Sequence, residues 1–322
     1  MRLAEFEDAI AFLNEGDDFL ITSHINSDGD AVGACLGMRR LLEGLGKSAR
    51  IVLQDIPEDH YEFLVGFEDI VTASEVPVQA ASFAIVLDCP AVDRIGSVQG
   101  FIDAETRILN VDHHKDNTHF GHVNLVSGDV CSTSELLYHL ARDMDAEIDA
   151  ALAEHLYTGI VYDTGGFRYS LTTPTSLETG ADLVRRGARL DFIADRIYNS
   201  NSLASVKLIG HAIDTLEVLY EGRVAYLHLS NRDMQAGDPE AAVNYGLMIR
   251  SVEVTVLLKE EEPKHYRISL RSRDSVDVSA IAGRFGGGGH KRAAGCRLDG
   301  EETEIKAAVL EEVAKHLVEA VA

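Results

Sequence analysis

Cysteine is scarce in this 322-residue sequence, and the four cysteines lie far apart, at Cys35, Cys89, Cys131 and Cys296. They do not have the close spacing of a zinc-binding cysteine motif, and a chain of this length with four scattered cysteines does not resemble a disulfide framework. We therefore interpret them as small core thiols of a protein that works in a reducing compartment.

Long apolar runs are also missing. No uninterrupted stretch approaches the roughly 18 apolar residues that a membrane-spanning helix needs. The first residues, MRLAEFEDAIAFL, predict an acidic amphipathic helix rather than a signal peptide. These two absences lead us to expect a cytoplasmic protein without a membrane partner.

Basic residues are outnumbered, 29 against 53 acidic ones, which gives a formal net charge of −24. This balance argues against a protein that binds long nucleic acid through its phosphates. It leaves room for a short anionic substrate, held by bound metal and a few arginines, while the acidic bulk repels long polyanions. Solubility or adaptation to salt explains the charge equally well.

The rest of the composition describes a globular protein, with 46% hydrophobic and 25% charged residues and enough length for two domains. In residues 1–190, strand and helix patterns alternate, which predicts an α/β domain with a doubly wound parallel sheet. We expect strands near 18–23, 49–53, 83–88 and 107–111. We expect helices near 4–14, 31–45, 133–143 and 150–161.

The polar segment 191–202 predicts a linker, and residues 203–322 predict a smaller α/β domain with a mixed sheet. We expect its strands near 223–229, 252–259 and 265–271. We expect its helices near 203–217, 277–285 and 302–321, with a glycine run before the last one.

The stretch ITSHINSDGDAVGA, residues 21–34, places His24, Asp28 and Asp30 on the turn between the first strand and the following helix. This is the carboxyl end of a strand, where open α/β sheets bind their ligands. One imidazole and two carboxylates so close together would repel or stay protonated unless a cation lay among them. An Asp-Gly turn that caps the helix is an equally good interpretation of this motif alone.

Three further strand or helix ends carry the same residue types. Asp88 is the first polar residue after the apolar run FAIVL, Asp112-His113-His114 follow ILNV, and Asp163 follows a predicted helix. A parallel sheet gathers such loops at one edge, so we expect six donors to converge there. They are His24, Asp28, Asp30, Asp88, His113 and Asp163.

Six donors are too many for one divalent ion and suit a pair of ions that activates water for displacement at phosphorus. Mixed imidazole and carboxylate ligands favour Mn²⁺, with Co²⁺, Zn²⁺ or Fe²⁺ as possible substitutes and Mg²⁺ less suited. The sequence therefore predicts a two-metal hydrolase.

A second signal is the stretch FGGGGHKRAAG, residues 285–295. Because Gly287, Gly288 and Gly289 have no side chains, their amides can approach an anion or a base closely, and His290 adds positive charge. Arg271, near the end of YRISLRS, can bind a phosphate with its forked guanidinium. The alternative interpretations are that the glycine run is a flexible connection and that Arg271 is an ordinary surface residue.

The order HxxxDxD, D, DHH, D and GGGGH resembles the DHH phosphoesterase superfamily with its DHH-associated C-terminal domain, over nearly the whole chain. The resemblance implies that His24, Asp28 and Asp88 hold one ion. It implies that Asp30, His113 and Asp163 hold the other, with Asp88 bridging the two ions.

The same resemblance implies two roles in catalysis. Asp112 would orient a ligand without touching metal, and His114 would neutralise the scissile phosphate or protonate the leaving oxygen. Ser27 stands where the family usually has proline, which changes the stiffness of the turn and leaves the ligands intact.

Within the superfamily the sequence is most similar to the branch that combines oligoribonuclease and 3'-phosphoadenosine-5'-phosphate (pAp) phosphatase activity. This implies hydrolysis of short single-stranded RNA, of linear dinucleotides such as pApA and of pAp, by a homodimer. The alternatives are a cyclic dinucleotide phosphodiesterase, an inorganic pyrophosphatase or polyphosphatase, and a non-catalytic nucleotide-binding or metal-storage protein.

Overall fold

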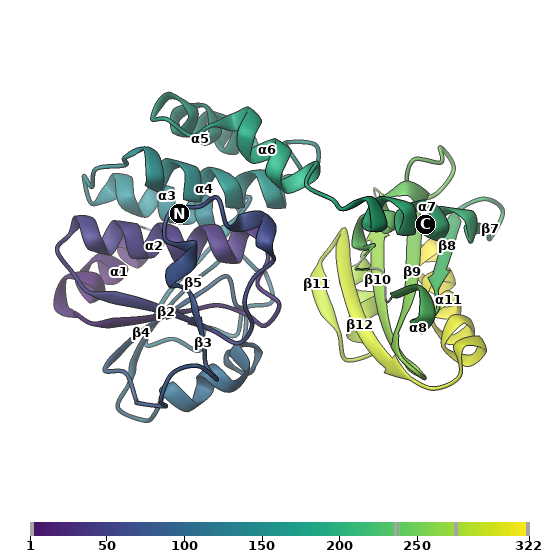
Figure 1. Cartoon of the computed structure of the whole chain (residues 1–322), viewed down its shortest axis with the longest axis horizontal. Helices are drawn as coiled ribbons and strands as arrows, with labels where there is room; N and C mark the ends of the chain where they lie inside the picture. Colours follow the sequence, from purple (N-terminus) through teal and green to yellow (C-terminus); the bar gives the residue numbers. More distant parts are fainter. Residues whose placement is uncertain (1–2, 235–236, 238, 274–275, 320–322) are drawn as a thin grey trace. The chain divides into compact units, whose positions relative to one another are not determined.

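A computed structural model describes residues 3–234, 237, 239–273 and 276–319 of the chain (Figure 1). The chain divides into two compact units, Met1–Ser200 and Asn201–Ala322. Within the described residues, every helix is too short or too polar to cross a lipid bilayer.

The first unit contains a six-stranded sheet in the order β3-β2-β1-β4-β5-β6, and all its strand pairs are parallel. The strands are β1 (Phe19–Thr22), β2 (Ala49–Leu53), β3 (Val71–Thr72), β4 (Phe83–Leu87), β5 (Arg107–Asp112) and β6 (Val123–Val126). The central strands β1, β4 and β5 are neighbours, so the polar residues that follow them emerge at one edge.

Both faces of this sheet are covered, which explains why its strands read as near-continuous apolar runs. Ile21 and Ile85 face the core under the α-helices, whereas Leu20 and Val86 face a second core with Ile95. The first core lies beneath α1 (Leu3–Glu15), α2 (Gly29–Gly44), α3 (Thr133–Asp143) and α4 (Ala150–Asp163), as Figure 1 shows.

The second face is covered by η3 (Val92–Phe101), two 3₁₀ turns that meet at Gly96 with φ 61°. Helices α5 (Pro174–Arg185) and α6 (Leu190–Tyr198) follow α4. Short 3₁₀ turns are η1 (Asp59–Tyr61) and η2 (Phe67–Asp69). The predicted α/β fold with a parallel sheet is confirmed, although 3₁₀ turns rather than α-helices cover this second face.

The sequence-based element assignment omits the edge strands β3 and β6 and helix α5. It also describes residues 191–202 as a linker, whereas α6 occupies most of that segment. Helix α6 packs against the first unit through Ile193, which is fully buried in its core. The polar residues of this segment therefore belong to a helix and not to an unstructured linker.

The second unit contains a mixed sheet in the order β11-β12-β10-β9-β8-β7. Among the described strands of this unit, β8 and β9 pair in parallel and the other pairs are antiparallel. The strands are β7 (Glu217–Leu219), β8 (Val224–Leu229), β9 (Val254–Glu262), β10 (His265–Ser272), β11 (Gly288–His290) and β12 (Ala293–Asp299). The predicted mixed sheet is therefore confirmed.

Helices α10 (Val278–Gly283) and α11 (Glu302–Glu319) pack on one face of this sheet, where Ile268 and Val313 are buried. The other face carries a smaller core beneath α7 (Leu203–Asp214). The short turns α8 (Asn231–Met234), η4 (Glu240–Ala242) and α9 (Val243–Gly246) also belong to this unit. The last two residues of the predicted helix 302–321 lie outside the described residues.

Candidate metal centre

The turn after β1 positions His24 and Asp28 through local hydrogen bonds. Asp28 is the N-cap of α2, and its Oδ1 accepts from the backbone nitrogens of Asp30 and Ala31 at 3.0 and 3.2 Å. The cap interpretation of this motif is therefore correct, and it leaves the other carboxylate oxygen of Asp28 available. Ser27, at the usual proline position, donates to the carbonyl of His24 at 2.9 Å and so tightens the turn.

His24 is held in one orientation, because its Nδ1 lies 2.8 Å from the carbonyl oxygen of Ile25. Nδ1 is the donor in this contact, since a carbonyl can only accept. The other ring nitrogen, Nε2, lies 3.5 Å from Oδ2 of Asp88. His24 thus presents Nε2 as the atom for a ligand.

Asp88 lies at the centre of the site. It follows β4 in a left-handed conformation with φ 50°, and its backbone nitrogen donates to Val111 at 3.0 Å. While Oδ2 faces His24, Oδ1 lies 3.5 Å from Nε2 of His113. The two oxygens of one buried carboxylate therefore face two different imidazoles.

Asp30 is the second residue of α2, and its buried carboxylate lies against the start of α3. Its Oδ2 accepts from the backbone nitrogen of Thr133 at 2.6 Å, and its Oδ1 accepts from that of Ser134 at 3.0 Å. These nitrogens belong to the first turn of a helix, where unpaired donors and the helix dipole favour an anion. Asp30 lies 4.0 Å from Nε2 of His113, which itself lies 3.1 Å from Oδ2 of Asp163.

The six predicted donors form two groups that adjoin at Asp88. His24, Asp28 and Asp88 form one group, and Asp30, His113 and Asp163 form the other. In each group, one possible ligand atom from every residue lies within 4.8 Å of the others. The structure thus brings together all six residues from four separate segments of the chain.

Two glycines allow this convergence by letting α2, α3 and α4 approach closely. A Cβ atom on Gly33 would lie 2.5 Å from the carbonyl oxygen of His155 in α4. One on Gly159 would collide with Ser134 and with the carboxylate of Asp30. Close helix packing therefore depends on residues whose importance lies in having no side chain.

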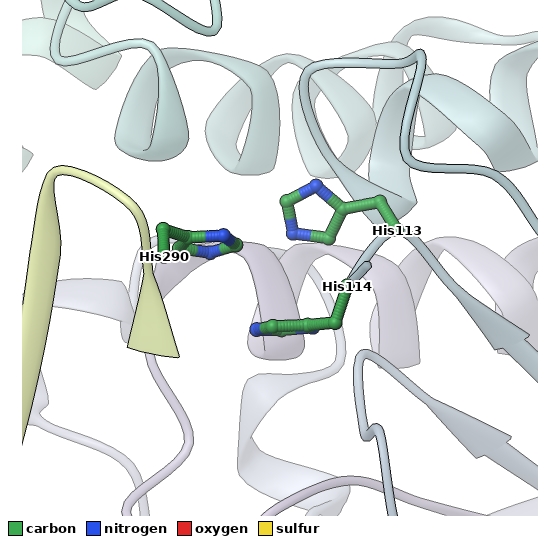
Figure 2. Close-up of side chains that lie close together, drawn as sticks. All are labelled: His113, His114 and His290. Carbon is green, nitrogen blue, oxygen red and sulfur yellow. The ribbon is translucent and has the colours of Figure 1, made fainter. Parts of the chain in front are cut away.

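Asp112 and His114 form a pair beside the two groups. Nδ1 of His114 lies 2.8 Å from Oδ1 of Asp112, and Asn117 donates to Oδ2 of Asp112 at 2.6 Å. Figure 2 shows the rings of His113 and His114 side by side beyond β5, with 4.9 Å between their centroids. Because Nδ1 of His114 donates to Asp112, Nε2 is the ring nitrogen of His114 that points away from Asp112.

Electrostatics within the site favour protonated imidazoles. Burial opposes charge on His24, but its contacts with the Asp88 carboxylate raise its pKa to about 9. Burial likewise opposes charge on His113, whose pKa the contact with Asp163 raises to about 10. At Asp88 burial is outweighed by the surrounding imidazoles, which hold the pKa of that carboxyl well below its ordinary value.

Asp28 and Asp30 have the opposite tendency from Asp88. Burial beside Asp88 raises the pKa of Asp28 to about 6 and raises that of Asp30 well above its ordinary value. Carboxyls with raised pKa values next to one another need either protons or a cation. The donor set is therefore chemically suited to divalent metal.

The sequence does not single out Thr133 as the hydrogen-bond partner of Asp88 and Asp30. Its hydroxyl donates to Oδ1 of Asp88 at 3.1 Å, and its amide binds Asp30. The available signal was the sequence Ser132-Thr-Ser-Glu135, which is typical of a helix N-terminus. Ser132 is indeed the N-cap of α3 and accepts from the backbone nitrogen of Glu135 at 3.0 Å.

In the second unit, the glycine run is not the loop that we expected. Gly288 and His290 belong to the edge strand β11, which pairs with β12. A Cβ on Gly289 would lie 2.6 Å from the carbonyl oxygen of Ala293, whereas one on Gly288 would meet open space. A Cβ on Gly287 would lie 2.1 Å from the carbonyl oxygen of Gly295. Strand pairing therefore explains two of these glycines, and Gly288 remains open to a ligand.

Arg271 lies on β10 and is already in contact with an acid. Its Nη2 lies 3.3 Å from Oε1 of Glu240, and its Nη1 donates to the carbonyl of Leu270 at 3.0 Å. The predicted phosphate-binding arginine is thus partly occupied by partners from its own unit.

Two family models match this chain, one in each unit. Residues 18–160 match the DHH family, N-terminal domain, and residues 221–320 match the DHHA1 domain. The chain belongs to the DHH family.

Two curated relatives share most of their length with this chain. A bifunctional oligoribonuclease and PAP phosphatase NrnA from Thermus thermophilus is 33% identical over 306 residues, which cover 93% of this chain and 90% of that protein. A probable NrnA from Streptococcus mutans is 26% identical and covers 91% of this chain and 93% of that protein.

A solved structure resembles this chain along its whole length. The crystal structure of an exopolyphosphatase-related protein from Bacteroides fragilis has a TM-score of 0.91 and 26% sequence identity. The match covers 100% of this chain and 98% of that one.

Proposed function

We propose that the chain is a metal-dependent phosphoesterase that hydrolyses short oligoribonucleotides, linear dinucleotides such as pApA, and pAp. The names of the relatives from Thermus thermophilus and Streptococcus mutans support the substrate class. The observation that carries the proposal is the position of Asp88, whose two oxygens face the imidazoles of two different donor groups.

The residues present fit a pair of divalent ions. His24 and Asp28 would hold one ion, Asp30, His113 and Asp163 would hold the other, and Asp88 would contribute an oxygen to each. When bound, such ions act as Lewis acids on phosphate and lower the pKa of water. Two imidazoles among four carboxylates favour Mn²⁺ over Mg²⁺, with Co²⁺, Zn²⁺ and Fe²⁺ as substitutes.

His114 and Asp112 would contribute the proton chemistry. The hydrogen bond to Asp112 keeps the proton on Nδ1 of His114 and sets the plane of its ring. Burial opposes the charge on His114, but Asp112 and Asp88 raise its pKa above the ordinary value. A charged ring can neutralise the scissile phosphate or donate a proton from Nε2 to the leaving oxygen.

The second unit would bind the nucleotide end of the substrate. Arg271 supplies a guanidinium on β10, and the segment with Gly287, Gly288, Gly289 and His290 supplies backbone that borders open space at Gly288. A DHH-catalytic role for residues 1–190 and a substrate-binding role for residues 203–322 follow from this assignment. Exclusion of long duplexes, a homodimer and a cytoplasmic location remain predictions of the same proposal.

A direct assay separates this function from its alternatives. Purified chain is incubated with pApA, pAp, cyclic di-AMP and pyrophosphate, each with Mn²⁺ and with EDTA. We expect turnover of pApA and pAp with Mn²⁺ alone. A preference for cyclic di-AMP or pyrophosphate would assign the chain to one of those rival activities, and no turnover of any compound would leave a binding protein.

A second assay tests the role of the C-terminal residues. Arg271→Ala and His290→Ala should raise KM for pApA much more than they reduce turnover of an activated small phosphodiester. Lys264→Ala is the matched control, because Lys264 is exposed and pairs only with Glu301 among the described contacts. Equal losses on both substrates would contradict a role in binding the nucleotide end.

A further inference from the structure

Strands β9, β10 and β12 place four basic side chains on one face of the second sheet. Arg267 and Arg271 alternate on β10 and so point to the same side. Arg267 lies opposite Lys259 of β9 and opposite Arg297 of β12. We call Lys259, Arg267, Arg271 and Arg297 the basic face.

Glu240 of η4 lies against this basic face. Its Oε2 accepts from Nζ of Lys259 at 2.6 Å and from the hydroxyl of Ser269 at 2.8 Å, while Oε1 lies 3.3 Å from Arg271. The Lys259 side chain is completely buried, whereas that of Glu240 is 32% exposed. Glu240 therefore contacts a buried cation on one side and the proposed phosphate-binding arginine on the other.

A second acid, Glu261, lies elsewhere on the same face. It is 3.1 Å from Arg297 and 3.9 Å from Arg267, and its side chain is 34% exposed. Glu240 and Glu261 thus each neutralise part of the positive charge that these four side chains bring to the face, in a chain whose net charge is −24.

We propose that Glu240 is a specificity-determining residue. It lowers the affinity of the basic face for ligands with a doubly charged terminal phosphate, relative to ligands with a singly charged phosphodiester. The inference rests on the proposed function, in which Arg271 binds the substrate. A phosphate that approaches Arg271 is attracted by the guanidinium and repelled by the adjacent carboxylate. Because repulsion grows with the charge of the ligand, Glu240 disfavours a dianionic terminal phosphate more than a monoanionic phosphodiester.

This role differs from a purely structural one. Glu240 also neutralises Lys259, and burial of an unpaired ammonium is costly. If that were its whole role, replacing it would change stability and leave the relative affinity for ligands of different charge as it is. The relative affinity is therefore the informative measurement.

The test compares two ligands that share the nucleoside and a tetrahedral end group but differ in charge. AMP carries nearly two negative charges at pH 8, and adenosine 5'-sulfate carries one. Neither carries the phosphodiester bond or the 3'-phosphate that the proposed function hydrolyses, so binding to the full chain with Mn²⁺ can be measured by calorimetry. We expect Glu240→Gln to strengthen AMP binding about five- to tenfold more than sulfate binding, since one nearby charge is removed. The difference should shrink at high salt.

Matched variants separate this effect from general changes in charge or folding. Glu261→Gln removes the same charge beside Arg267 and Arg297, away from Arg271, and should alter the affinity ratio less than about twofold. Glu240→Gln with Lys259→Met removes one charge of each sign and should restore the wild-type ratio. Lys259→Met alone should shift the ratio in the opposite direction. It tests the proposal even if Glu240→Gln fails to fold by circular dichroism.

The possible failures are distinguishable. If AMP and adenosine 5'-sulfate both bind the wild type and Glu240→Gln leaves their ratio unchanged, Glu240 is only the counter-ion of Lys259 and the inference is overturned. If neither ligand binds the wild type, the nucleotide-binding role of this unit fails, and the inference fails with it.

Discussion

The hydroxyl of Thr133 donates a hydrogen bond of 3.1 Å to Oδ1 of Asp88, across 45 positions of the chain. Both side chains are buried, and the amide of Thr133 also binds the carboxylate of Asp30. The first residue of α3 thus orients one carboxylate from each of two strand ends. A helix N-terminus serves here as the partner that fixes two predicted metal ligands.

Thr133→Val removes the hydroxyl and keeps the shape of the side chain and the backbone amide. Asp88 then loses a hydrogen bond that orients it, while Asp30 keeps its amide donor. We expect Mn²⁺ affinity, measured by calorimetric titration, to fall about 10- to 100-fold, as for other residues that orient metal ligands. Thr133→Ser retains the donor and should bind close to the wild-type level. Equal Mn²⁺ affinity of Thr133→Val and the wild type would contradict the role of Thr133 in orienting Asp88.

Asp88→Asn replaces the shared carboxylate by a neutral amide. Both donor groups lose an anionic oxygen, so we expect bound Mn²⁺ to decrease and kcat/KM for pApA to fall about a thousandfold or more. Metal content by mass spectrometry and initial rates check the two parts separately. Asp93→Asn is the control, because Asp93 is exposed on η3 and outside both groups. Near-normal turnover in Asp88→Asn would contradict a bridging role.

Gly159→Ala adds one methyl group where α4 passes the carboxylate of Asp30 and the hydroxyl of Ser134. The helix or the carboxylate must move, so we expect the free energy of unfolding to fall by about 1–3 kcal/mol. We also expect weaker Mn²⁺ binding. Gly44→Ala is the control, since no heavy atom lies within 4 Å of a Cβ at that helical position. Urea unfolding and Mn²⁺ titration of both variants check this, and parallel behaviour would show that the close approach is not required.

The convergence of five of the six donors was predictable because they follow strands that end at the same edge of a parallel sheet, whereas Asp163 is the last residue of helix α4. Asp88 and His113 are clear examples, since β4 is the apolar run FAIVL and β5 contains the buried apolar residues Ile108, Leu109 and Val111. Their role as metal ligands stays a prediction. The sequence could not indicate that the backbone nitrogens of Thr133 and Ser134 bind Asp30, because every residue except proline has such a nitrogen.

The second unit was harder to predict for a related reason. The glycine run suggested a loop, but pairing with β12 makes Gly288 and His290 an edge strand. The contact between Glu240 and Arg271 spans 31 positions and joins a 3₁₀ turn to a strand. The sequence around either residue does not predict this contact, because it forms only when the tertiary structure brings the two segments together.

His155 provides a prediction about pH that is independent of the metal ligands. The ring is buried in α4, its Nε2 lies 3.0 Å from the carbonyl oxygen of Val65, and burial lowers its pKa to about 4. In the unfolded chain the pKa is about 6.5. Between these values the unfolded state binds the extra proton, so stability falls as pH falls from about 6.5 towards 4.

His155→Gln keeps a hydrogen-bond donor for Val65 and removes the titrating ring. We expect the wild type to lose about 2–3 kcal/mol more unfolding free energy than this variant between pH 7 and pH 4.5. Urea unfolding with EDTA measures the difference without a contribution from bound metal. His265→Gln, at an exposed position, should follow the wild type. If His155→Gln also lost stability in parallel with the wild type, the buried ring would have to accept its proton as readily in the folded chain as in the unfolded one.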